Sequence, residues 1–194
     1  MIFTNMAWIY LQTAKVIFEM DLHIIPECYV DTNLIETIVP TGGGFNHQKG
    51  CGTVAKVMKE RFSDDFAVGI IDKDKQQLDY LKEFEIIHTV GNLTLHKHIS
   101  RAHYIIQIYP AIERFILNAV DECGLEMSDY DLPSDFSELK KASKTVNSKF
   151  DKRFKKLFRD LYGSGSTELV LLSKWVSYLK ETNYQVDLNE VKTI

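Results

Sequence analysis

The sequence has few cysteines and no long apolar run. Its three cysteines are an odd number, and no two of them have Cys-x-x-Cys spacing. This argues against a disulfide framework or a zinc-binding module and predicts reduced thiols in a cytoplasmic protein. No stretch approaches the ~18 consecutive apolar residues of a membrane span, so we expect no membrane association.

The N-terminal residues lack the marks of a secretory signal. Residues 1–19 are fairly apolar, but they have neither a basic first region nor a small-residue cleavage site. A compact strand pattern begins only after Met20. Residues 1–20 are therefore treated as an N-terminal extension, which is either an appended helix or the product of a start site assigned too far upstream.

Strand and helix patterns alternate over residues 21–125. A strand over 22–30 is followed by a helix with Asp31 or Thr32 as its N-cap. Further strands are predicted at 66–72, 85–90, 93–99 and 103–109, and further helices at 53–62, 75–84 and 110–124. After residue 126 only helical patterns remain, at 134–147, 149–161 and 166–181. We expect a three-layer, Rossmann-like α/β domain with a mainly parallel sheet, followed by an α-helical C-terminal extension over 126–194.

Two acids follow the most hydrophobic strand. Asp72 and Asp74 come directly after "FAVGII" and are one residue apart. Two carboxylates about 4 Å apart repel by roughly 4 kcal/mol at an effective dielectric near 20, so such a pair takes up a proton or holds a cation. Oxygen ligands without nearby His or Cys favour Mg²⁺. The alternative is that Asp74 caps a helix beginning at Lys75.

Other acids are positioned to join this pair. Glu27 ends the first strand, and neighbouring parallel strands open on the same edge of a sheet, where open α/β proteins place ligands. Asp31 and Glu113 lie near the starts of later helices. They are further candidate metal ligands.

These residues resemble a known family. "PECYVDTNLIETIV" resembles the first strand and helix of a TOPRIM domain, and "VGIIDKDK" resembles that family's Asp-x-Asp strand. "YPAIERFI" is similar to a Pro-x-x-Glu segment found in some TOPRIM-containing nucleases of the overcoming-lysogenisation-defect type. The resemblance covers residues 21–120.

The resemblance implies a metal-dependent nuclease. Asp72 and Asp74 would ligate Mg²⁺ or Mn²⁺, and Glu27 would share the ion or act as general acid or base. Two departures stand against it. Cys28 occupies the place where the family commonly has Gly, and the chain has no Walker A motif.

A glycine turn is a candidate phosphate site. In "NHQKGCGTV" a lysine and two glycines precede a predicted helix, whose free amides suit an anion, and His47 and Lys49 would add donors. An ordinary glycine turn is the alternative.

Positive charge is concentrated in one segment. Residues 140–159 hold nine of the 23 Lys and Arg residues and one acid, although the whole chain has a net charge of −4. The predicted helix has an apolar stripe comprising Phe150, Phe154, Leu157, Phe158 and Leu161. Its cations form a candidate track for DNA or RNA: Lys149, Lys152, Arg153, Lys155, Lys156 and Arg159. A solvated face, or one against a partner subunit, is the alternative.

Three histidines cluster in "LHKHISRAH". His96, His98 and His103 lack the pattern of a zinc site, so we interpret them as exposed strand residues or substrate contacts. The leading functional hypothesis is therefore Mg²⁺-dependent phosphodiester chemistry on nucleic acid. A non-catalytic nucleic-acid- or nucleotide-binding regulator, a partner subunit or homo-oligomer, and a small-molecule phosphatase or phosphotransferase stay open.

Overall fold

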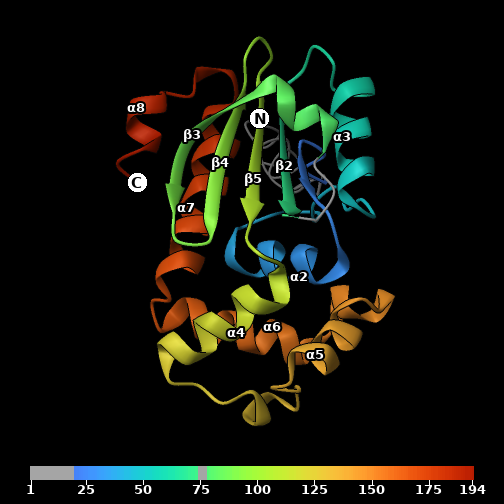
Figure 1. Cartoon of the computed structure of the whole chain (residues 1–194), viewed down its shortest axis with the longest axis vertical. Helices are drawn as coiled ribbons and strands as arrows, with labels where there is room; N and C mark the ends of the chain where they lie inside the picture. Colours follow the sequence, from blue (N-terminus) through green and yellow to red (C-terminus); the bar gives the residue numbers. More distant parts are fainter. Residues whose placement is uncertain (1–19, 74–77) are drawn as a thin grey trace, which may run out of the picture.

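The computed structural model of the chain describes residues 20–73 and 78–194, in which a five-stranded sheet is flanked by helices (Figure 1). The strands are β1 (Ile24–Pro26), β2 (Ala67–Asp72), β3 (Phe84–Val90), β4 (Leu93–His98) and β5 (His103–Ile108). Their order is β1-β2-β5-β4-β3. The β1–β2 and β2–β5 pairs are parallel, whereas β4 pairs antiparallel with both β5 and β3. The α/β class is thus confirmed, and the sheet is mixed, with β4 running opposite to the other strands.

Seven α-helices lie in the described part of the chain, of which the last was not predicted. They are α2 (Tyr29–Ile38), α3 (Cys51–Glu60), α4 (Ile112–Cys123), α5 (Phe136–Ser143), α6 (Lys152–Gly163), α7 (Thr167–Thr182) and α8 (Leu188–Val191). Short 3₁₀ turns are η1 (Asp79–Glu83), η2 (Met127–Tyr130), η3 (Val146–Phe150) and η4 (Asn183–Gln185). In Figure 1, α2, α4, α5 and α6 gather below the carboxyl ends of β2 and β5.

The central strand β2 separates two hydrophobic cores. Val68 and Ile70 face a large core that also takes residues from α2, α4, α6 and α7, whereas Ala67 and Ile71 face a smaller core under α3. This follows from the alternation of side chains along a strand. Gly69 lets α3 approach closely, because a Cβ at this position would lie 2.9 Å from Val54 Cγ1.

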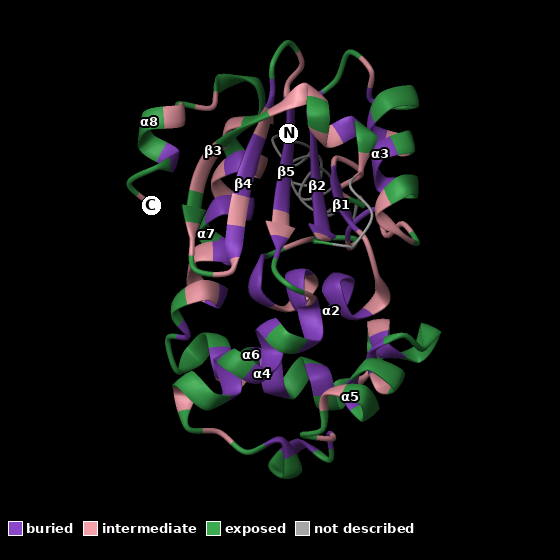
Figure 2. Ribbon diagram, in the orientation of Figure 1, coloured by how far each residue is buried: buried purple, intermediate pink, exposed green. Residues whose placement is uncertain are grey.

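The C-terminal helices belong to the large core. Trp175 of α7 is fully buried, and its ring lies against His88 of β3 with 6.0 Å between the ring centroids. The Ser173 hydroxyl donates to the carbonyl of Ile38 at 2.8 Å, which ties α7 to α2. Figure 2 shows buried residues running from the sheet into these helices. The predicted boundary at residues 125 and 126 therefore divides elements that share one core.

Two predicted elements differ from the structure. The strand predicted over 22–30 is shorter, because Cys28 is the N-cap of α2 and places Asp31 in the first helical turn. The helix predicted over 75–84 is a 3₁₀ turn in its described part, from Asp79.

In the described part of the chain, no helix is long and apolar enough to cross a membrane.

Candidate active site at the carboxyl edge of the sheet

Glu27 and Asp72 meet at the edge where β1 and β2 end. Because these strands are parallel, their carboxyl ends open side by side. The backbone amide of Asp72 donates to Glu27 Oε2 at 2.9 Å. The structure therefore brings together two of the predicted site residues, Glu27 and Asp72.

Asp31 lies in the first turn of α2. The Cys28 amide donates to Asp31 Oδ2 at 3.1 Å, and the Asp31 amide donates to Cys28 Sγ at 3.5 Å, which makes a reciprocal capping box. Asp31 is 1% exposed, and its Oδ1 has no hydrogen-bond partner among the described residues. Cys28 was not predicted as a cap, although Cys-x-x-Asp has the spacing of a capping box.

Helix α4 supplies the fourth acid. Asp72 Oδ1 accepts a hydrogen bond from the first helical amide, that of Ile112, at 2.9 Å. Glu113, the next residue, is buried and accepts from the Ser143 hydroxyl at 2.5 Å. The sequence predicted Glu113 as a candidate, but nothing in its pattern indicated Ser143, which comes from α5.

These four residues, Glu27, Asp31, Asp72 and Glu113, are called the acid cluster below. Burial is the largest cause that raises the pKa of Asp72, to about 9, and the charges of the other three raise it further. Burial also raises the pKa of Asp31, to about 7, with Glu27 and Glu113 adding to the effect. Hydrogen bonds from Ile112 and Cys28 oppose these shifts. Asp72 therefore retains a proton at neutral pH.

The acid cluster is not arranged as a complete coordination sphere. Among the described residues, no group of three or more His, Cys, Asp or Glu side chains is placed so that it could hold a metal ion. Asp74, the remaining predicted ligand, lies outside the described residues.

The predicted phosphate turn runs beside the acid cluster. The Gly50 amide donates to the carbonyl of Glu27 at 3.3 Å, and Gly50 is the N-cap of α3. Lys49 is exposed, whereas His47 is half-buried. His47 Nδ1 lies 2.9 Å from Thr32 Oγ1, and its ring stacks on Tyr29 at 4.3 Å between centroids. Burial and the nearby Lys149 lower the pKa of His47.

Helix α6 is amphipathic, as predicted. Its buried residues are Phe154, Leu157, Phe158 and Leu161, and its exposed cations include Lys152, Lys155 and Arg159. The two other predicted cations of α6 are partly engaged. The Arg153 guanidinium pairs with Asp151 at 2.7 Å, and the Lys156 ammonium lies 4.8 Å from the centroid of the Tyr130 ring.

The start of this helix differs from the prediction. Asp151 is the N-cap of α6, so Lys149 and Phe150 belong to η3 instead. Lys149 is half-buried and lies 3.7 Å from Glu36 of α2. Phe150 is 75% exposed and is not part of the apolar stripe that the sequence predicted.

The histidines are buried rather than exposed. His96, His98 and His103 are at most 8% exposed. His98 Nε2 lies 3.1 Å from Glu83, and His103 Nδ1 lies 2.5 Å from the Tyr80 hydroxyl. The interpretation of these residues as exposed strand histidines is therefore wrong.

No family model matches the chain, and no curated protein or solved structure shows significant similarity to it. The resemblance to TOPRIM domains stays a prediction from residues 21–120.

Proposed function

We propose that this protein is a nuclease that carries out Mg²⁺- or Mn²⁺-dependent phosphodiester chemistry on nucleic acid. The observation that carries the proposal is the contact between Glu27 and Asp72 at the carboxyl ends of two parallel strands. This is the edge at which open α/β sheets bind their ligands.

The chemistry of the donor set suits a hard divalent cation. The acid cluster holds four carboxylates, and burial and mutual repulsion raise the pKa of two of them. A divalent cation would replace the protons that this repulsion retains. The buried Asp31 Oδ1, which has no hydrogen-bond partner in the described part of the chain, is a further oxygen available to such an ion or to its water.

Bound there, the ion would polarise a phosphoryl oxygen and neutralise charge that develops in the transition state. Asp72 and Asp74 would hold it, and Glu27 would share it or move a proton at the reacting oxygen. Lys49 and the first amides of α3 would bind a neighbouring phosphate. The exposed cations of α6 would hold the strand.

The test is cleavage of mixed DNA and RNA substrates with Mg²⁺ or Mn²⁺, against EDTA. Asp72→Asn is the informative variant, because its amide oxygen can still accept the hydrogen bond that caps α4. We expect cleavage to fall by about 100-fold or more, the scale of losing one electrostatic stabiliser of a transition state. Asp64→Asn, at an exposed acid outside the acid cluster, is the matched control and should cut normally.

A specific observation favours the second candidate, a non-catalytic nucleic-acid-binding regulator. Asp31 and Asp72 already accept backbone amides at the starts of α2 and α4, which is a sufficient structural reason for buried acids. Binding of nucleic acid without metal-dependent cutting would select this candidate. Release of phosphate from small esters alone would instead indicate a phosphatase.

A further inference from the structure

The turn η3 presents apolar side chains to solvent amid positive charge. Phe150 is 75% exposed and Val146 is 63% exposed. The Lys149 ammonium lies 5.5 Å from the centroid of the Phe150 ring. Exposed lysines precede and follow the turn in sequence: Lys140, Lys141, Lys144, Lys152 and Lys155.

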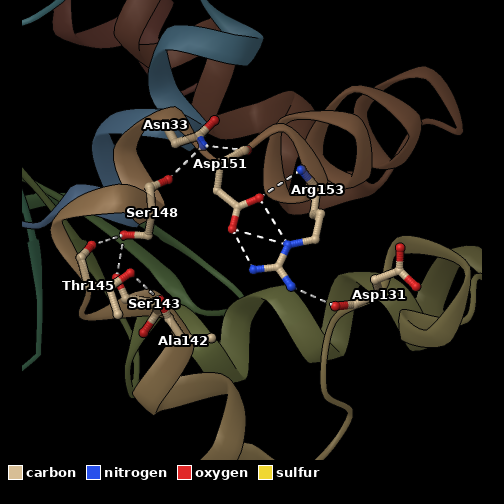
Figure 3. A network of polar contacts seen from close by, with 8 residues as sticks. All are labelled: Asn33, Asp131, Ala142, Ser143, Thr145, Ser148, Asp151 and Arg153. Atoms are coloured by element: carbon tan, nitrogen blue, oxygen red, sulfur yellow. Dashed lines mark hydrogen bonds and ion pairs between the residues drawn. The ribbon is translucent and has the colours of Figure 1, made fainter.

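A buried polar network fixes the backbone on both sides of Phe150 (Figure 3). Asn33 Nδ2 donates to the carbonyls of Ser148 at 2.8 Å and Asp151 at 3.1 Å. The fully buried Ser148 hydroxyl donates to the carbonyls of Ser143 at 2.6 Å and Thr145 at 2.7 Å. Phe150 is therefore exposed on a backbone held by hydrogen bonds rather than on a loose segment.

The same network joins η3 to the acid cluster. Asn33 follows Asp31 by two residues in α2, and the Ser143 hydroxyl donates to Glu113. Helix α2, through Asn33, and helix α5, through Ser143, therefore each connect η3 with the acid cluster. An oligonucleotide bound at the acid cluster would thus be held by the same part of the fold that carries the Phe150 ring.

We propose that Phe150 is a stacking platform for a base of single-stranded nucleic acid, with the neighbouring lysines on the phosphates. The choice of ligand rests on the proposed nucleic-acid function. Every base has a face that stacks on an aromatic ring, whereas the bases of a duplex already stack on each other. The charge favours nucleic acid over an apolar protein partner, because the one acid of residues 140–159, Asp151, is paired with Arg153.

The experiment measures the affinity of the full chain for fluorescein-labelled oligonucleotides by anisotropy, in EDTA, so that no strand is cut. The probes are single-stranded DNA and RNA, a DNA duplex, and an abasic strand of equal length. We expect Phe150→Ala to weaken binding of the single strands about tenfold, within the range measured for loss of one base–aromatic stack. Affinity for the duplex and the abasic strand should change less than twofold.

Two variants control the interpretation. Phe150→Trp should retain the affinity for single strands, because its ring also stacks. Ile99→Ala removes another exposed apolar side chain, 69% exposed in the turn between β4 and β5, and should bind as the unmodified protein does.

Three outcomes overturn the proposal: unchanged affinity of Phe150→Ala for single strands, an equal loss on the abasic strand, or no binding of single strands by the unmodified protein. A loss of self-association in Phe150→Ala with unchanged oligonucleotide affinity also overturns it and assigns the turn to a contact between copies of the chain. Metal-dependent cleavage is measured separately with the Asp72→Asn pair. Cleavage without a role for Phe150 would leave the proposed nuclease function standing and reject the stacking platform. Stacking on Phe150 without metal-dependent cleavage would do the opposite.

Discussion

At Asp31, one carboxylate oxygen accepts the Cys28 amide and the other has no hydrogen-bond partner among the described residues. A buried carboxyl oxygen left unpaired costs free energy, and the protein avoids the larger cost of a buried charge when the group holds a proton or meets a cation. The raised pKa of Asp31, about 7, is the consequence of this position. The divalent ion that we propose would take the place of this proton.

Asn33 carries a testable structural role at the same scale. Its amide group is the buried donor for two backbone carbonyls of the η3 region, so Asn33→Ala removes both hydrogen bonds. We expect the free energy of unfolding to fall by about 2 kcal/mol, the scale of losing two hydrogen bonds. Urea denaturation measures it. The exposed Asn118→Ala on α4 should change it by less than about 0.5 kcal/mol, and equal losses in both variants would contradict the role of Asn33.

Helical spacing alone does not show which of Phe150 and Phe154 is buried. Both fit one apolar stripe by spacing, yet Phe154 is fully buried and Phe150 is exposed. The difference comes from Asp151, which caps α6 with its side chain and ends the η3 turn before it. An Asp preceding an amphipathic run is a cap signal, but the bonds from Asn33, over a hundred residues away, could not be read from the sequence.

At the scale of elements, the strands and the edge they form were predictable. The apolar runs of β2 and β5 indicated where these strands lie. Because the carboxyl ends of parallel strands meet at one edge of the sheet, Glu27 was expected beside Asp72. The start of α2 was predicted three residues late, because a thiol is an unusual cap. The antiparallel pairing of β4 was missed, since the direction of a strand leaves little trace in its own residues.

Two buried histidines tie elements together on the α3 side of the sheet. His103 Nε2 lies 2.8 Å from the carbonyl of Phe62, just beyond α3, and its other nitrogen lies beside Tyr80 of η1. His98 Nδ1 accepts the amides of Ser100 and Arg101, each at 3.1 Å. His98 Nδ1 therefore carries no proton.

We expect the contributions of His98 and His103 to the free energy of unfolding to fall as the pH drops below about 6.5, the ordinary pKa of histidine, whereas the raised pKa values of Asp31 and Asp72 act in the opposite direction. Burial is the main cause that lowers the pKa of His98 and His103 in the folded state, and Arg101 also lowers both. Glu83 raises the pKa of His98 and so opposes its shift. Backbone hydrogen bonds likewise oppose the shift of the pKa of His103. The unfolded chain then binds more protons, so each pH unit below this point costs up to about 1.4 kcal/mol per histidine until the folded pKa is reached.

Urea denaturation between pH 7.5 and pH 5 measures this dependence. His98→Gln keeps an acceptor for the two amides and a donor for Glu83 but does not titrate. The unmodified protein should therefore lose stability relative to His98→Gln as the pH falls. Parallel pH profiles for the two proteins would show that His98 does not contribute.

At the scale of the whole molecule, the helices after residue 125 complete the core of the sheet. Leu172, Trp175 and Val176 of α7 are fully buried in the core that contains Val68 and Ile70 of β2. Glu168 of α7 also accepts the Asn92 amide at the β3–β4 turn, at 2.6 Å. The acid cluster depends on this arrangement, because Ser143 of α5 bonds to Glu113.

The chain should consequently unfold as one cooperative unit. A chain ending at Leu125 would expose the face of the sheet that α7 covers, and we expect it to lack a cooperative urea transition. In the full chain with Trp8 replaced by Phe, fluorescence reports on Trp175 of α7, and far-UV circular dichroism reports on all elements. The two transitions should coincide, as two-state unfolding requires. Separate midpoints, or a shortened chain that unfolds cooperatively, would instead establish an independent helical unit after residue 125.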